Sequence, residues 1–159
     1  MILDGKKLRD ELLISYKEKI SKDNLSITLA IILVGDDEAS KLYIKNKEKY
    51  CSMVGINVIK YLLPKETSEE ELISLIKSLN EKEEVTGIIL QSPVPSNINF
   101  DKCSGLINEN KDVDGFTKDN VYNLYLNKKS ILPCTVKGII RLLDSCLLYT
   151  SDAADDRIS

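Results

Sequence analysis

The stretch "SITLAIILVG", residues 26–35, limits the possible folds of this chain more than any other segment. It is a nearly unbroken run of aliphatic and β-branched residues without polar alternation. A strand of this kind needs both of its faces covered, as at the centre of a parallel sheet. The run therefore predicts an α/β fold in which helices lie on either side of the sheet.

The neighbouring segments alternate as such a fold requires. Two further apolar runs predict strands, and apolar residues at helical spacing predict helices. The predicted strands cover residues 26–35, 56–63 and 85–90. The predicted helices cover residues 3–20, 38–54, 67–80, 101–108 and 117–126, and another helix starts within 139–145. This order predicts one three-layer alternating domain with a mainly parallel sheet.

Short signals mark the ends of several elements. Gly55 is a plausible C-cap of the second helix. Ser68 and Glu71 stand at capping-box spacing, and Thr117 can cap a later helix. In "QSPVPS", Pro93 and the second proline lack the N–H donors of an internal strand, so a rigid loop follows the third strand. Because ligands bind at the carboxyl ends of parallel strands, Gln91 is a candidate contact, although it could equally end the strand.

The helix containing "SKLYIKNK" offers a second group of candidates. Ser40, Tyr43 and Lys47 stand at i, i+3 and i+7, on one stripe of the helix. A solvated charged face with Tyr43 as a packing residue explains the same spacing. The chain contains no histidine, so acid–base chemistry near neutral pH would need a lysine, carboxylate, tyrosine or cysteine.

The remaining polar and cysteine residues give weaker signals. Asp112 and Asp114 precede Gly115 in "KDVDGF", a pattern typical of an Asx-turn that can also serve binding. Cys134 has no neighbouring base, and the four cysteines show no CxxC spacing, so reduced structural thiols and no metal site are expected.

Charge and hydropathy limit which cellular location and which binding partners are expected. The net charge of -3 gives no reason to expect nucleic acid or an anionic membrane. No apolar run approaches the roughly 20 residues that span a bilayer. The N-terminus also lacks a signal-peptide layout, so a cytoplasmic location is expected.

Four separated motifs, "SKLYIKNK", "LQSPVP", "KDVDGF" and "PCTVKG", occur in this order along the chain. Together they resemble the N-terminal catalytic domain of the bifunctional methylenetetrahydrofolate dehydrogenase and methenyltetrahydrofolate cyclohydrolase family. The opening "ILDGKKL", the strand end "LVG" and the turn "VGI" are also similar to that family. The resemblance runs from residue 2 to about residue 145.

The resemblance implies a role for each matching residue. Tyr43 would stack on the folate ring system, Lys47 would be the catalytic lysine, Gln91 would hold that lysine, and Asp114 would hold the pterin. The implied catalytic residues are Tyr43, Lys47 and Gln91. The implied substrate-binding residues are Ser40, Tyr43, Pro93, Val94 and Asp114. The sequence departs from the family's pattern at Ser92, where a leucine is usual, and at Val136, where a proline is common.

The resemblance also implies a reaction sequence in one-carbon metabolism. A hydride leaves 5,10-methylenetetrahydrofolate for NADP or NAD, and water then opens the methenyl bridge to give 10-formyltetrahydrofolate, a step on the way to purine biosynthesis. Lys47 would act as acid and base in the hydrolysis, so we expect its amine to face inward, largely shielded from water. Tetrahydrofolate derivatives are the implied partners, and the full-length parent is expected to form a homodimer.

The family's second domain, which binds the dinucleotide, has no counterpart here. The sequence contains no G-x-G-x-x-G motif, so we expect this chain to bind neither cofactor nor metal and to run no dehydrogenase alone. Apolar surface should be left open where that domain would pack. From Cys146, "CLLYTSDAADD" resembles a translated sequencing adapter. We therefore expect residues 1–145 to form the catalytic domain and residues 146–159 to be a non-native tail.

Two alternatives stay open. A non-catalytic folate-binding module would keep the pocket without the chemistry, and replacing Lys47 distinguishes it from an enzyme. The substrate domain of an amino-acid or shikimate-type dehydrogenase would share the architecture alone, but its substrate signatures are not evident in this sequence.

Overall fold

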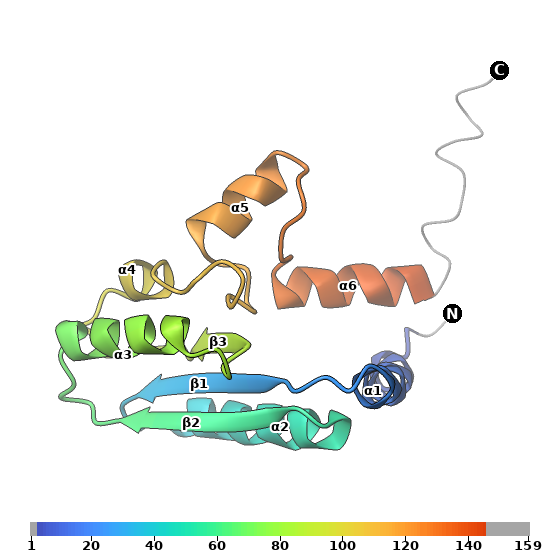
Figure 1. Ribbon diagram of the computed structural model, residues 1–159, viewed down its shortest axis with the longest axis horizontal. Helices are drawn as coiled ribbons and strands as arrows, with labels where there is room; N and C mark the ends of the chain where they lie inside the picture. Colours follow the sequence, from blue (N-terminus) through green and yellow to red (C-terminus); the bar gives the residue numbers. More distant parts are fainter. Residues whose placement is uncertain (1–2, 146–159) are drawn as a thin grey trace.

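A computed structural model describes residues 3–145 and shows helices on both sides of a parallel sheet (Figure 1). The strands are β1 (Thr28–Val34), β2 (Asn57–Leu63) and β3 (Gly87–Leu90), paired in the order β2-β1-β3. The helices are α1 (Gly5–Lys22), α2 (Glu38–Val54), α3 (Glu69–Glu81), α4 (Phe100–Ser104), α5 (Lys118–Tyr125) and α6 (Cys134–Ser145). The predicted three-layer α/β fold is confirmed. The predicted tail, residues 146–159, lies outside the described residues.

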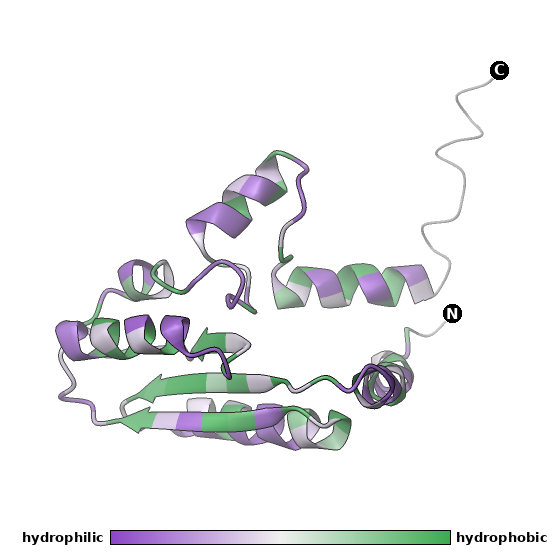
Figure 2. Cartoon of the chain, in the orientation of Figure 1, coloured by the Kyte–Doolittle hydropathy of each residue, from purple (hydrophilic) through white to green (hydrophobic). Residues whose placement is uncertain are grey.

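The central strand β1 is buried on both faces, which explains its continuous apolar sequence. Alternate side chains point to opposite faces of a sheet. Ala30 and Ile32 belong to the core cluster that includes Ile76 of α3. Ile31 and its odd-numbered neighbours pack with Ile44 of α2 on the other face. Figure 2 shows the same strand as hydrophobic along most of its length.

The predicted caps form as expected. Gly55 ends α2 in the left-handed conformation at φ +91°, and Ser68 and Glu71 make both hydrogen bonds of the capping box. The Thr117 side chain accepts from the N–H of Asn120 at the start of α5. Two boundaries differ from the prediction by more than two residues: α4 ends at Ser104, and α6 already begins at Cys134.

The three strands run in the same direction, so their carboxyl ends lie along one edge of the sheet. The segment "KDV" lies next to β3, where the N–H of Ile88 donates to the Lys111 carbonyl at 2.7 Å and Ile88 forms a parallel bridge with Asp112. This bridge holds the loop that follows Asp112 close to the sheet. The polar loops after β1, β3 and Asp112 therefore surround the same region.

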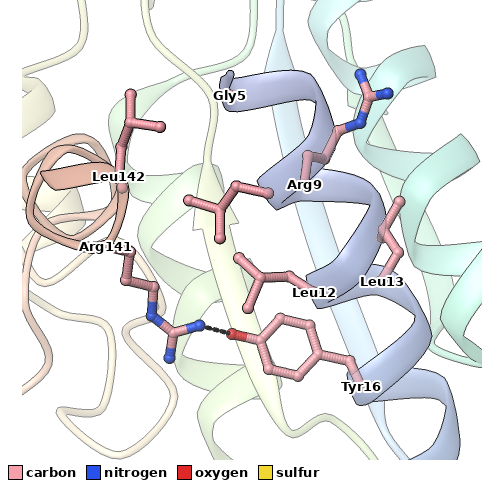
Figure 3. A pocket seen from close by; sticks show the side chains of 9 residues that line it. Gly5, Arg9, Leu12, Leu13, Tyr16, Arg141 and Leu142 are labelled. Atoms are coloured by element: carbon pink, nitrogen blue, oxygen red, sulfur yellow. Dashed lines mark hydrogen bonds between the residues drawn. The ribbon is translucent and has the colours of Figure 1, made fainter. Parts of the chain in front are cut away.

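An apolar groove of about 310 Å³ lies between α1 and α6, as Figure 3 shows. Leu12 and Leu142 line it, and a hydrogen bond from Arg141 to the Tyr16 hydroxyl closes one side. It is an apolar surface left open between these two helices. Within residues 3–145, no helix is long and apolar enough to cross a membrane.

Candidate active site

A direct hydrogen bond joins two of the predicted site residues. The Lys47 Nζ atom, on α2, donates to Gln91 Oε1 at 3.1 Å, and both side chains are partly buried. Gln91 follows β3 directly, and its backbone N–H donates to the Ile32 carbonyl at 2.8 Å. The amide side chain is thus held by the end of the sheet, facing the helix that carries the lysine.

The loop after Asp112 brings a carboxylate to the same region. Asp114 is partly buried, and burial raises its pKa, while the positive charge of Lys47 acts in the opposite direction. The Asp114 carboxylate is therefore within electrostatic range of the lysine amine. The structure therefore joins Lys47 of α2 to Gln91 at the end of β3, with Asp114 of the later loop within electrostatic range of the lysine.

Asp112 differs from Asp114 in its burial and in its hydrogen bonds. It is 2% exposed, and its carboxylate accepts from the N–H groups of Gly115 and Thr117 at 2.9 and 2.8 Å and from Asn120 Nδ2 at 3.0 Å. Burial pushes the pKa of Asp112 upward, but these hydrogen bonds outweigh it and hold the pKa below its ordinary value. Asp112 is therefore the organiser of the loop, as an Asx-turn residue.

The "PCT" segment packs against this loop. Gly115 has φ +73°, and a Cβ at this position would lie 2.5 Å from the Ile131 carbonyl oxygen. Cys134 Sγ donates to the Val113 carbonyl at 3.3 Å. Desolvation and the Asp114 carboxylate raise the pKa of the Cys134 thiol, which disfavours the reactive thiolate, and the residue is exposed.

The other predicted residues lie around this centre. Tyr43 is 64% exposed, which leaves its ring accessible on the surface of α2. Pro93 and Val94 line a hollow of about 340 Å³ at the end of β1. Ser40 is 2% exposed, and its hydroxyl donates to the Ser92 carbonyl at 3.3 Å. The stripe thus contains a buried Ser40, an exposed Tyr43 and a partly buried Lys47, and is no uniformly solvated face.

Two residues that were not singled out from sequence make notable interactions. Cys51 lies one turn after Lys47; desolvation raises the pKa of its thiol, while the charge of Lys47 lowers it. The i, i+4 spacing could have indicated this pair. Lys111 donates to the carbonyls of Leu79, Asn80 and Lys82 at 3.1, 2.6 and 2.7 Å and so closes the C-terminal end of α3. No local signal in "KDVDGF" indicates this contact, which depends on tertiary packing.

The donor atoms do not suggest a metal. Across residues 3–145, no group of three or more cysteines, aspartates or glutamates is placed to hold an ion. The apolar groove between α1 and α6 is also separate from the site, since none of the candidate residues lines it.

Comparisons with known proteins agree on one family. The family model described as "Tetrahydrofolate dehydrogenase/cyclohydrolase, catalytic domain" matches residues 3–114. The "Bifunctional protein FolD" of Lachnoclostridium phytofermentans is 42% identical over 146 residues, which cover 90% of this chain and 52% of that protein. The chain thus spans about half the length of the curated relatives it matches.

Solved structures give the same result for the fold. The bifunctional FolD enzyme of Campylobacter jejuni aligns with a TM-score of 0.88 at 39% identity, covering 92% of this chain and 53% of that one. A 5,10-methylenetetrahydrofolate dehydrogenase from the silkworm Bombyx mori aligns with a TM-score of 0.89 at 36% identity, covering 91% and 51%.

Proposed function

The chain belongs to the tetrahydrofolate dehydrogenase/cyclohydrolase family, and we propose that it binds tetrahydrofolate derivatives and supplies the residues that hydrolyse the methenyl bridge. In the longer protein, the same site would hold 5,10-methylenetetrahydrofolate during its NADP-dependent oxidation. The hydrolysis then yields 10-formyltetrahydrofolate. The single observation that carries this proposal is the hydrogen bond from Lys47 to Gln91 with Asp114 in electrostatic reach.

The hydrolytic step needs a group that moves protons. Water attacks the bridging carbon and must lose a proton, and the ring nitrogen whose bond to that carbon breaks must gain one. Lys47 accepts the proton that the attacking water loses and delivers a proton to the ring nitrogen. The remaining hydroxyl proton leaves to solvent as the formyl C=O forms, so that the cationic substrate gives a neutral product and one released proton. Gln91 keeps the amine in place, because its carbonyl oxygen accepts a hydrogen bond from either form of the lysine.

The remaining residues orient the substrate. The accessible ring of Tyr43 offers a stacking surface for the pterin. The Asp114 carboxylate pairs with the donor edge of the pterin, and this two-point contact fixes which face of the folate is presented. Because burial disfavours its charged form, Asp114 gains from a partner that donates hydrogen bonds. Pro93 and Val94, which line the hollow at the end of β1, complete the walls.

The oxidation would also need a dinucleotide, and no residue of this chain is assigned to bind one. The printed sequence has no G-x-G-x-x-G motif, so no step is assigned here to NADP or NAD. This chain's part in the hydride step is alignment of the folate. A cytoplasmic location and a homodimer of the longer protein belong to the same proposal.

Replacement of Lys47 by alanine tests the proposal. Hydrolysis of 5,10-methenyltetrahydrofolate is followed by its absorbance under single-turnover conditions, with the chain in excess so that slow reaction is measurable. Binding is followed by titration calorimetry. We expect Lys47→Ala to lower the hydrolysis rate by about a hundredfold or more, while the dissociation constant changes by less than about threefold.

Lys45→Ala is the matched control, since Lys45 is exposed on the same helix. It should change neither quantity. An unchanged rate in Lys47→Ala would remove the lysine from the mechanism. Tight binding by the unaltered chain without any hydrolysis above the buffer rate would favour the non-catalytic folate-binding module.

A further inference from the structure

One main-chain carbonyl, that of Ser92, receives two side-chain hydrogen bonds from different parts of the chain. Gln91 Nε2 donates to it at 2.8 Å, and Ser40 Oγ donates to it at 3.3 Å. Gln91 belongs to the loop after β3, and Ser40 belongs to the first turn of α2. The carbonyl is therefore a shared acceptor at the junction of the helix and the loop.

The two contacts of Gln91 fix the orientation of its amide. A lysine amine donates to the oxygen side of the amide, and a backbone carbonyl accepts only from the nitrogen side. Lys47 meets Oε1, and the Ser92 carbonyl meets Nε2. A rotation of the amide by half a turn would break both contacts and set the Nε2 donors against the amine.

Ser40 holds this acceptor from the helix side. Its N–H donates to Asp37 Oδ2 at 2.7 Å, so the first turn of α2 is fixed, and its hydroxyl is buried at 2% exposure. Lys47 follows two turns later on the same helix. The hydroxyl of Ser40 thereby ties the loop that carries Gln91 to the helix that carries Lys47.

We propose that Ser40 is a positioning residue: through the Ser92 carbonyl it sets the amide orientation of Gln91 and hence the place of the Lys47 amine. For its effect on the reaction rate, this inference rests on the proposed hydrolytic function. It assigns Ser40 a role through the protein rather than a contact with folate, in accordance with its burial.

The test compares Ser40→Ala with a matched control, Ser104→Ala. Ser104 is also buried, at 7% exposure, and its hydroxyl also donates to a main-chain carbonyl, that of Asp101, but it lies on α4. The first measurement is the side-chain amide signal of Gln91 in nitrogen-15 NMR spectra, identified by its loss in Gln91→Glu. The second is single-turnover hydrolysis at several substrate concentrations.

We expect Ser40→Ala to shift the Gln91 amide signals and to lower the maximal hydrolysis rate by about three- to tenfold, as expected for one lost hydrogen bond, with half-saturation within about twofold. Ser104→Ala should change neither. Ser40→Thr, which retains the hydroxyl, should restore the wild-type Gln91 signals and rate.

Unchanged Gln91 signals in Ser40→Ala would overturn the inference, and so would shifted signals with an unchanged rate. These outcomes differ from a failure of the proposed function. In that case, Lys47→Ala would leave hydrolysis unaltered, while the NMR comparison would still decide whether Ser40 controls the amide.

Discussion

At the residue scale, the two aspartates of "KDVDGF" do different work despite their similar surroundings in sequence. Asp112 is buried and receives hydrogen bonds from the backbone of Gly115 and Thr117 and from the Asn120 amide. Asp114 is partly buried, and burial raises its pKa. The sequence predicts the turn, but which of the two carboxylates forms it depends on donors that only the folded loop supplies.

Asp112→Ala should therefore destabilise the chain strongly. It leaves three buried donors without their acceptor, which costs about 2 to 4 kcal/mol in the free energy of unfolding. Urea unfolding measures the loss, and Asp144→Ala, which replaces an exposed aspartate, is the control. A loss no larger than that of the control would contradict the role given to Asp112.

The same residue predicts a pH dependence. The folded-state pKa of Asp112 is lowered, so its contribution to stability is present above the ordinary carboxylate pKa and is lost as the pH falls through the folded value. The difference in unfolding free energy between wild type and Asp112→Ala should thus be largest near neutrality and shrink toward about pH 3. A difference that grows in acid would have the wrong sign.

At the scale of elements, the ends of helices were predicted well where the capping residue and the helix lie in one short stretch of sequence. Gly55, Ser68 and Thr117 each end or begin a helix as expected. The end of α4 and the start of α6 were less well predicted, although Asn99 caps α4 and Gly105 follows its last residue. The contact of Lys111 with the end of α3 lay beyond sequence analysis, since the partners are about thirty residues apart and meet only in the folded layers.

Two glycine substitutions test the packing of loop and helix at this scale. Gly115→Ala should lower the free energy of unfolding by more than about 1 kcal/mol, because the position has φ +73° and the added Cβ would meet the Ile131 carbonyl. Gly138→Ala should raise it by about 0.5 to 1 kcal/mol, because Gly138 lies inside α6 and a Cβ there meets nothing within 4 Å. Thermal and urea unfolding measure both, and equal effects of the two changes would contradict this account.

At the scale of the whole molecule, the site depends on the direction of the strands. Lys47 and Gln91 are 44 residues apart in sequence, and they meet because α2 packs on one face of the sheet while Gln91 follows β3 at the carboxyl edge. The parallel direction of the strands could be anticipated from the alternation of helices and strands, and Gln91 from its position after β3. That Lys47 belongs to the site was predicted only from the family resemblance, because its spacing on the helix fits a solvated charged face equally well.

The printed chain of 159 residues, produced alone, should bind folate without oxidising it. Its sequence has no Gly-rich dinucleotide motif, so a hydride acceptor has no site that we can assign. The measurement is reduction of NADP in the presence of 5,10-methylenetetrahydrofolate, with the Campylobacter jejuni enzyme as positive control. Turnover comparable to that control would contradict the prediction.

The pairing of β1 also has a consequence for how the chain reaches its native state. Thr28 pairs with Asn57 and Leu29 with Gly87, so neither ladder can begin from a tight hairpin. Each requires an entire intervening helix to be bridged before the first interstrand bond forms, and the entropy of closing such loops is lost before any burial compensates it. Refolding should accordingly be slower than that of a helical bundle of equal length, with collapse around β1 as the limiting event.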